Sequence, residues 1–188
     1  FIVHESVAEE FGSKFAAKMG ELKLGRGVAE GTTCGPVINQ AAQDNMERLV
    51  AATLSEGGDV LVGGEPLEGD GYFFKPMVLD NVSENSTIWN EEIFGPVAPI
   101  MRFKNEEDAV RLANDTEYGL ISYVYSEDLK RAIRFAEGIE AGMVGINRGL
   151  LSDPAAPFGG VKQSGLGREG GFDGVHEFLQ TKYIGVEI

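Results

Sequence analysis

The sequence of 188 residues contains very little cysteine, histidine or positive charge. The single cysteine, Cys34, cannot form a disulfide within the chain. The chain has only two histidines, both distant from Cys34 in the sequence, and these three residues are a poor set of metal ligands. Lysine and arginine number 16 against 30 aspartate and glutamate, which gives a net charge of −14. Because no basic stripe offsets this charge, the chain should repel phosphate backbones, and nucleic acid is excluded as an expected partner.

Long apolar runs and an initiator methionine are also missing. No apolar run approaches the roughly 20 residues that cross a bilayer, and no signal peptide opens the chain, so we expect no membrane partner and a cytoplasmic location. The chain opens with the apolar run Phe1-Ile2-Val3, which is typical of a strand, and we therefore expect a fragment of a longer protein. A content of 43% hydrophobic and 24% charged residues is that of a globular domain.

The chain does show a regular alternation of short apolar runs with amphipathic segments. Helices are predicted to begin at the capping-box residues 6–9 and at the cap Asn105. Two more are predicted over residues 39–55 and 128–137. Strands are predicted at 1–3, 60–62, 72–79, 97–103, 120–125 and 142–146, and a last one at 183–188. This order predicts an α/β fold, a parallel twisted sheet with helices on both faces.

Apolar spacing also predicts which helix faces are buried. The residues expected to point inward are Val7, Phe11, Phe15 and Met19 in the first helix, Met46, Leu49, Val50 and Leu54 in the second, and Leu129, Ile133 and Ala136 in the last. Residues 147–171 are rich in glycine and lack periodicity, and they follow a predicted central strand. Open α/β sheets bind ligands at that end, so this loop is the prime candidate for a site.

Residues 165–170 match the pattern G-x-G-x-x-G, but the residues before them do not form a predicted strand, so a glycine-rich loop is favoured over a dinucleotide-binding turn. Cys34 lies in an early loop without a partnering base, and a structural or surface cysteine is the favoured interpretation. His4 and His176 are interpreted in the same way, as satisfied histidines at a strand end and on a helix.

The segment Glu91-Glu92-Ile93-Phe94-Gly95-Pro96-Val97 is more specific. Gly95-Pro96 turns the backbone, so that Glu92 and Phe94 would be presented from a tight corner. A carboxylate there can accept hydrogen bonds from a ribose diol, and a phenyl ring can pack on a heterocycle. The alternative is a solvated acidic pair beside a core phenylalanine.

Residues 91–97 resemble the E-E-x-F-G-P-V motif of the aldehyde dehydrogenase superfamily. Residues 157–170, Pro-Phe-Gly-Gly-Val-Lys-Gln-Ser-Gly-Leu-Gly-Arg-Glu-Gly, resemble its P-F-G-G-x-K-x-S-G-x-G-R-E-x-G motif, and residues 35–38 and 141–147 fit further landmarks. The resemblance covers essentially the whole chain in the right order. Within the superfamily, residues 152–170 most resemble succinate-semialdehyde dehydrogenases.

The resemblance implies NAD- or NADP-dependent oxidation of an aldehyde to a carboxylic acid, with succinate semialdehyde as the expected substrate. It implies that Glu92 and Phe94 bind the nicotinamide side of the cofactor and that Asn147 is structural. Leu150, Ser152 and Phe158 would line the aldehyde tunnel, with Ser152 bonded to the carboxylate of the substrate. It also implies a homo-oligomer and a division into a catalytic α/β domain (1–147), an active-site loop with a returning helix (148–180), and an oligomerisation strand (181–188).

The resemblance covers only a C-terminal portion of the family. The family's nucleophilic cysteine, general base and phosphate-binding segment precede the position of Phe1, so no catalytic residue is assigned in this incomplete domain, and the fragment alone is expected to be inactive. Alternative hypotheses are the same enzyme with an amino-aldehyde or aliphatic aldehyde, a non-catalytic oligomerisation module, and a self-contained dinucleotide binder.

Overall fold

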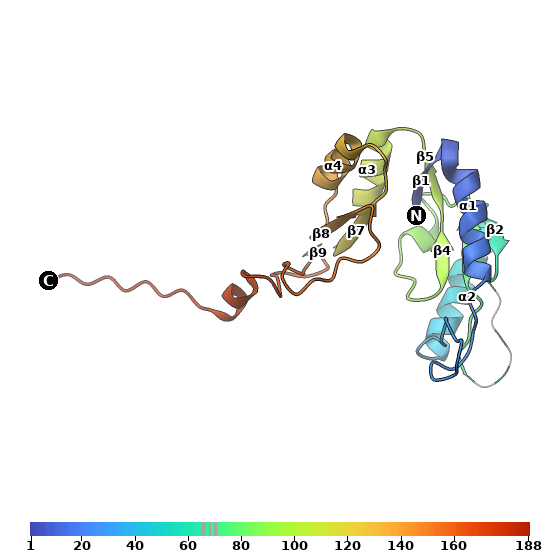
Figure 1. Ribbon diagram of the computed structural model, residues 1–188, viewed down its shortest axis with the longest axis horizontal. Helices are drawn as coiled ribbons and strands as arrows, with labels where there is room; N and C mark the ends of the chain where they lie inside the picture. The colour runs from blue at the N-terminus through green and yellow to red at the C-terminus, as the bar shows by residue number, and fades with distance from the viewer. Residues whose placement is uncertain (65–66, 68, 70) are drawn as a thin grey trace. The chain divides into compact units, whose positions relative to one another are not determined.

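The computed structural model describes residues 1–64, 67, 69 and 71–188, and it divides into two compact units, residues 1–109 and 110–188 (Figure 1). The helices are α1 (Glu5–Gly20), α2 (Gln40–Ser55), α3 (Glu106–Asn114) and α4 (Leu129–Gly138), with 3-10 helices η1 (Thr87–Trp89) and η2 (Gly174–Phe178). The strands are β1 (Ile2–His4), β2 (Asp59–Val62), β3 (Met77–Asp80), β4 (Val97–Pro99), β5 (Met101–Phe103), β6 (Tyr118–Gly119), β7 (Ile121–Val124), β8 (Met143–Ile146) and β9 (Val161–Lys162).

Three helices begin where they were predicted, and Asn105 is the cap that was expected. The side-chain oxygens of Asn39, Asn105 and Asp128 each accept a hydrogen bond from a backbone N–H three residues further on, at 2.9, 2.9 and 3.1 Å. These bonds satisfy donors that have no partner inside the helix, which is why short polar side chains at these positions fix the helix start.

The start of α1 differs from the prediction. The helix begins at Glu5, and His4 is its cap: Nδ1 of His4 accepts from the backbone N–H of Ser6 at 3.2 Å. Nε2 of the same ring lies 3.2 Å from the carbonyl oxygen of Lys104, so both ring nitrogens have partners. The interpretation of His4 as a satisfied histidine at a strand end is confirmed.

The first unit is built on a three-stranded sheet with the order β2-β3-β4, in which β2 is antiparallel and β4 parallel to β3. Strand β3 is buried throughout, and its side chains alternate between two hydrophobic clusters. Met77 and Leu79 pack with Met46 and Leu49 of α2, whereas Val78 packs with residues of α1. This small sheet is therefore covered on both faces by helices.

Elsewhere the strands pair two by two. β1 pairs with β5 and β7 with β8, both parallel, whereas β6 pairs with β9 antiparallel. The α/β class is confirmed, but the described residues form small separate sheets in place of one continuous parallel sheet. The predicted run 97–103 is interrupted at Ile100, so it supplies β4 to one sheet and β5 to another.

The predicted face of α2 is confirmed at Met46, Leu49 and Val50, whereas one residue of α2 and most of the predicted face of α4 differ from the prediction. In α4 the buried residue is Ala132, whereas Leu129 and Ile133 are 62% and 43% exposed. In α2, Leu54 is exposed and Thr53 is buried in its place, with its hydroxyl donating to the carbonyl oxygen of Leu49 at 2.8 Å. A buried hydroxyl with a backbone partner costs little, so apolar spacing alone did not identify this position.

Helix α1 also departs from its predicted face. Val7 is 50% exposed, and the fully buried residue is its neighbour Ala8. Phe11, Phe15 and Met19 are half-buried and pack against the cluster of Val78, Ala98 and Ile100, as expected.

Residues 179–188 form neither a helix nor a strand, and their apolar side chains are exposed, among them Tyr183, Ile184, Val186 and Ile188. A strand that adds to a partner's sheet needs that partner, so the oligomerisation strand stays a prediction, as does the functional division after residue 147. In the described part of the chain no helix is both long and apolar enough to cross a membrane.

An ion pair beside β3 predicts a specific dependence on pH. Asp80, the last residue of β3, is 5% exposed. Burial raises the pKa of its carboxyl, but the hydrogen bonds from Arg102 and from the backbone N–H of Asn81 lower this pKa by more, so the net shift is downward. Because the folded pKa is lowered, this stabilisation is present above the ordinary value near 3.8 and is lost as pH falls through the folded pKa.

We therefore expect Asp80→Asn to lower the free energy of unfolding at pH 7 by about 1–2 kcal/mol and to flatten its decline below pH 4. Urea unfolding followed by Trp89 fluorescence at pH 7, 5, 4 and 3 measures both effects. Glu30→Gln, which removes one exposed negative charge, is the control, and an equally steep acid limb in Asp80→Asn would contradict the assignment.

Candidate functional site

The predicted site residues fall in both units, so the two groups are described separately. In the first unit, Glu92 and Phe94 follow η1 and precede β4. Phe94 has a left-handed backbone, with φ of +45°, and its side chain is 82% exposed. A left-handed conformation is unfavourable for an aromatic residue, and such strain is concentrated at functional positions. The core-phenylalanine alternative is therefore wrong.

The turn after Phe94 is set by the core beneath it. A Cβ atom on Gly95 would lie 2.0 Å from the sulfur of Met46, a fully buried residue of α2, so any larger residue here would force the Met46 side chain to move. Glu92 is exposed, and no described residue forms a hydrogen bond with its carboxylate. Glu92 and Phe94 are therefore two exposed side chains, two residues apart, that can accept hydrogen bonds and offer a ring face to a ligand.

In the second unit the site loop leaves the end of β8 at Asn147. The Asn147 side chain forms two hydrogen bonds with the backbone of Ser126: its Oδ1 accepts from the N–H at 2.9 Å, and its Nδ2 donates to the carbonyl at 2.8 Å. Its own N–H donates to the carbonyl of Val124 at 2.9 Å. Asn147, with φ of +51°, thus joins the ends of β7 and β8, which supports a structural role.

The loop then returns along β8. Gly142, which precedes β8, is so close to the returning chain that a Cβ atom on it would lie 1.9 Å from the carbonyl oxygen of Gly159. Phe158 and Glu169 form a pair of backbone hydrogen bonds of 2.7 and 2.8 Å, which closes the following glycine-rich segment. Residues 148–158 are thereby fixed at both ends over the strand.

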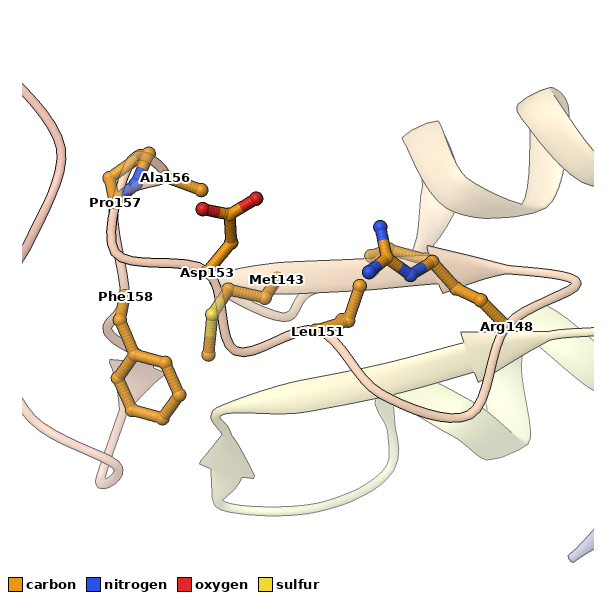
Figure 2. Close-up of a pocket in the computed structure, with 8 residues that line it drawn as sticks. Met143, Arg148, Leu151, Asp153, Ala156, Pro157 and Phe158 are labelled. Carbon is orange, nitrogen blue, oxygen red and sulfur yellow. The ribbon is translucent and has the colours of Figure 1, made fainter.

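A pocket of about 210 Å³ lies between β8 and this loop (Figure 2). Its lining consists of two residues of β8 and six of the loop: Met143, Val144, Arg148, Leu151, Asp153, Ala156, Pro157 and Phe158. In Figure 2 the carboxylate of Asp153 and the guanidinium of Arg148 flank the side chain of Leu151. The pocket therefore has an apolar floor between a positive and a negative group.

Of the three predicted tunnel residues, only Phe158 lines this pocket. Leu150 is 68% exposed, and Ser152 is also exposed. Along the sequence, each is followed by a residue that does line the pocket, Leu151 and Asp153 respectively. The structure thus does not bring Leu150 and Ser152 together with Phe158 in one pocket.

Arg148 is a pocket residue that motif comparison missed. Its Nε donates to the carbonyl of Leu150 at 2.7 Å, and its other nitrogens have no protein partner among the described residues. Its sequence position could have indicated a site residue. Arg148 follows the carboxyl end of β8, and open α/β sheets bind their ligands at that end.

Residues 165–170 are a series of turns with left-handed glycines at 165, 167 and 170, and no α-helix opens on them. The loop interpretation is therefore confirmed. Before them, Nζ of Lys162 donates to the carbonyls of Asn114 and Thr116 at 2.8 and 3.1 Å and pairs with Glu140. This lysine places a positive charge at the C-terminal end of α3, where it is favourable.

Cys34 has the surroundings of an unreactive thiol. Burial raises the pKa of Cys34, and its sulfur lies 3.7 Å from the carbonyl oxygen of Gly35. A raised pKa lowers the thiolate fraction at neutral pH, whereas a nucleophile needs it increased. His176 lies in η2 and is exposed. No group of described residues has the composition of a metal site.

We expect iodoacetamide to modify Cys34 several-fold more slowly at pH 7.5 in the folded chain than in the urea-unfolded chain. Mass spectrometry of timed samples measures both rates. Faster modification of the folded chain would instead indicate an activated thiolate and reinstate Cys34 as a nucleophile.

These features agree with comparisons to known proteins. Residues 1–184 match the aldehyde dehydrogenase family, and the chain belongs to this family. It is 54% identical over 186 residues to the succinate-semialdehyde dehydrogenase of Paenarthrobacter nicotinovorans, which covers 99% of this chain and 41% of that protein. It is 45% identical over 186 residues to a glutarate-semialdehyde dehydrogenase of Pseudomonas putida, covering 99% of this chain and 38% of the relative.

Solved structures give the same result. The crystal structure of succinate-semialdehyde dehydrogenase from Burkholderia pseudomallei superimposes with a TM-score of 0.92 at 50% identity, covering 95% of this chain and 37% of that one. The chain therefore spans about two fifths of the length of the relatives that it matches. Other relatives are named for NADP(+) or were solved with NAD+, so the chain is homologous to NAD(P)-dependent aldehyde dehydrogenases.

Proposed function

We propose that this chain forms the cofactor- and substrate-contacting part of an NAD(P)-dependent aldehyde dehydrogenase that oxidises succinate semialdehyde to the carboxylic acid. The observation that carries the proposal is the 54% identity, over essentially the whole chain, to a protein named succinate-semialdehyde dehydrogenase. The other portion of the enzyme supplies the nucleophile and the base.

Glu92 and Phe94 are the proposed contacts of the nicotinamide half of the cofactor. The dinucleotide, when bound, accepts the hydride that the aldehyde carbon releases. Glu92 accepts hydrogen bonds from the ribose hydroxyls, and Phe94 packs on the ring system and restricts its position. The free carboxylate of Glu92 and the 82% exposure of Phe94 support this assignment.

Leu150, Ser152 and Phe158 are the proposed aldehyde contacts. Leu150 and Phe158 exclude water from the carbon chain, and the hydroxyl of Ser152 donates to the distant carboxylate, which distinguishes a semialdehyde from a neutral aldehyde. We further propose that the active assembly is a homo-oligomer in the cytoplasm, to which residues 181–188 contribute a strand.

A hybrid enzyme tests the proposal. This chain replaces the matching two fifths of the Paenarthrobacter nicotinovorans relative, and NADH or NADPH formation is followed at 340 nm. We expect kcat/KM for succinate semialdehyde to exceed that for butanal and for betaine aldehyde by at least about tenfold, as expected for loss of a charge-assisted hydrogen bond. A hybrid that folds but prefers butanal would contradict the substrate, and one that oxidises no aldehyde would contradict the function.

Replacing Glu92 in the hybrid tests the cofactor site. Glu92→Gln should raise KM for the dinucleotide about 5- to 10-fold, because the amide accepts weaker hydrogen bonds than the carboxylate. KM for the aldehyde should stay within about twofold of the parent. A change confined to the aldehyde KM would place Glu92 at the substrate and contradict the cofactor role.

A further inference from the structure

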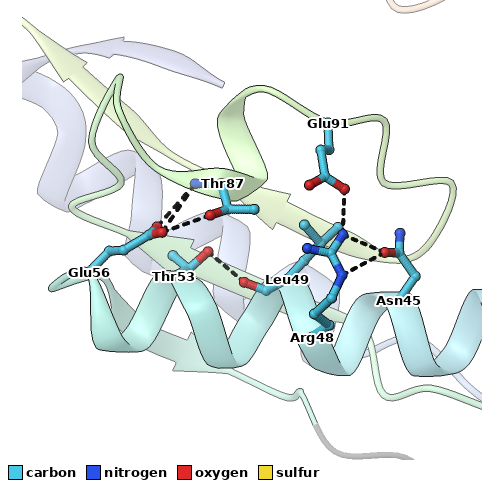
Figure 3. A network of polar contacts seen from close by, with 7 residues as sticks. All are labelled: Asn45, Arg48, Leu49, Thr53, Glu56, Thr87 and Glu91. Atoms are coloured by element: carbon cyan, nitrogen blue, oxygen red, sulfur yellow. Dashed lines mark hydrogen bonds and ion pairs between the residues drawn. The ribbon is translucent and has the colours of Figure 1, made fainter.

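The segment that presents Glu92 and Phe94 has no backbone tether of its own. Among the described residues, no backbone hydrogen bond involves residues 91–94, and the nearest ones join Asn90 to Thr87 and Val97 to Gly95. Side chains must therefore hold this stretch in place. The amide of Asn90 donates to the carbonyl of Ser86 at 3.0 Å, and the other attachments lead to helix α2 or to the hydrophobic cluster beneath it (Figure 3).

The first attachment fixes the beginning of the segment. Glu56, the residue after α2, accepts hydrogen bonds from the backbone N–H of Thr87 at 3.1 Å and from its hydroxyl at 2.8 Å. Ile88 follows and is 2% exposed within the cluster that contains Met46 and Leu49 of α2. These contacts anchor η1, three residues before the first glutamate of the motif.

The second attachment is an ion pair at the centre of the segment. A guanidinium nitrogen of Arg48 pairs with the carboxylate of Glu91, and the same group donates to Oδ1 of Asn45 through Nη2 at 2.7 Å and Nε at 3.3 Å. Figure 3 shows Arg48 extending from α2 to Glu91, with Asn45 beside it on the preceding turn. Because Asn45 fixes the guanidinium, less side-chain entropy is lost when Glu91 binds.

The third attachment lies at the far end. Gly95 rests directly on the sulfur of Met46, and Ile93 packs on the same cluster. Between the anchors at Thr87 and Gly95, the Arg48–Glu91 pair is the polar contact nearest to Glu92. It also balances the charge of one of two adjacent carboxylates beside a site proposed for an anionic dinucleotide.

We infer that Arg48, supported by Asn45, is a positioning residue for the dinucleotide: by holding Glu91 it fixes the backbone from which Glu92 and Phe94 face the nicotinamide half. This inference rests on the proposed cofactor role of Glu92 and Phe94. Arg48 itself touches neither the cofactor nor the substrate, and it acts through Glu91.

Two measurements on the 188-residue chain test this inference. The first is the ¹⁵N order parameter of the Glu92 and Phe94 amides, which is about 0.85 in rigid backbone and below about 0.6 in flexible backbone. We expect values near 0.85 in the parent chain, a fall toward 0.6 in both Arg48→Gln and Glu91→Gln, and recovery in the charge-swapped Arg48→Glu/Glu91→Arg variant. Unchanged values in Arg48→Gln would overturn the inference.

The second measurement is NADH binding, followed by energy transfer from Trp89, the single tryptophan of the chain, which lies in η1. Arg48→Gln and Glu91→Gln should each raise the Kd about 3- to 5-fold, the range of an exposed ion pair, and the charge-swapped variant should restore it. Lys18→Gln is the control, because it removes a more exposed ion pair, with Glu21 directly after α1, at a place away from the motif. Weaker binding in Arg48→Gln with tighter binding in Glu91→Gln would show a charge effect and overturn the positioning role.

The two readouts separate failure of this inference from failure of the proposed function. If the order parameters fall and recover as expected but Glu92→Gln leaves the dinucleotide KM of the hybrid enzyme unchanged, the cofactor assignment of Glu92 and Phe94 loses support while the hold of Arg48 on the segment stands. If NADH binds and the order parameters do not respond, the inference is overturned and the cofactor site stands.

Discussion

Gly142→Ala is expected to lower the free energy of unfolding of residues 110–188 by about 3–5 kcal/mol, which is in the high range for a single methyl group. The new Cβ would lie 1.9 Å from the carbonyl oxygen of Gly159 and 2.8 Å from the Cα of Gly160. Both neighbours are backbone atoms, so no side chain can rotate away, and the strand or the returning loop must move.

Hydrogen exchange of the β8 amides measures this loss, since the N–H of Met143 bonds to Leu120 and the N–H of Asn147 bonds to Val124. Gly149→Ala is the matched control in the same unit, because its nearest contact, the Tyr125 hydroxyl, would lie at an ordinary 3.6 Å. If the two variants lose equal stability, the close approach at Gly142 is not what holds the loop.

Ser152→Ala in the hybrid enzyme is expected to raise KM for succinate semialdehyde by roughly 10- to 150-fold. This is the effect of losing one hydrogen bond to a charged group, about 1.5–3 kcal/mol. Butanal has the same carbon chain without the carboxylate, so its KM should change less than about twofold.

Arg148→Gln is the companion variant for the carboxylate. Arg148 lines the pocket with Phe158, whereas Ser152, four residues further along the loop, does not, so the two candidates for a carboxylate contact are distinguishable. Equal effects of Ser152→Ala on both aldehydes would contradict the role of Ser152. A selective effect of Arg148→Gln alone would assign the carboxylate to the pocket in Figure 2.

Features encoded within a few residues were predictable from the sequence. The cap Asn105 and the helix starts at Asn39 and Asp128 depend on a backbone N–H three positions away, and they lie where expected. The motifs at 91–97 and 157–170 were sufficient to identify the family.

Features that depend on distant partners were predicted less well. The buried face of α4 is set by the strands beneath it, so the small Ala132 is inside while the larger Leu129 and Ile133 remain exposed. Pairing between strands is likewise a contact between remote segments, which is why one continuous sheet was expected and several small ones are found. The place of Arg148 after the end of β8 was readable from the sequence, but the pocket that it lines is completed by residues 156–158, which the return of the loop brings to the strand.

The amide of Asn147 has one further consequence. By bonding to both backbone groups of Ser126, its side chain continues the hydrogen bonding between β7 and β8 beyond the last paired residues, Val124 and Ile146. The Gly142–Gly159 contact holds the other end of the loop. Residues 148–157 therefore lie between two positions that the strands fix. Substitutions or changes of length within these residues are therefore expected to leave the register of β7 and β8 unchanged.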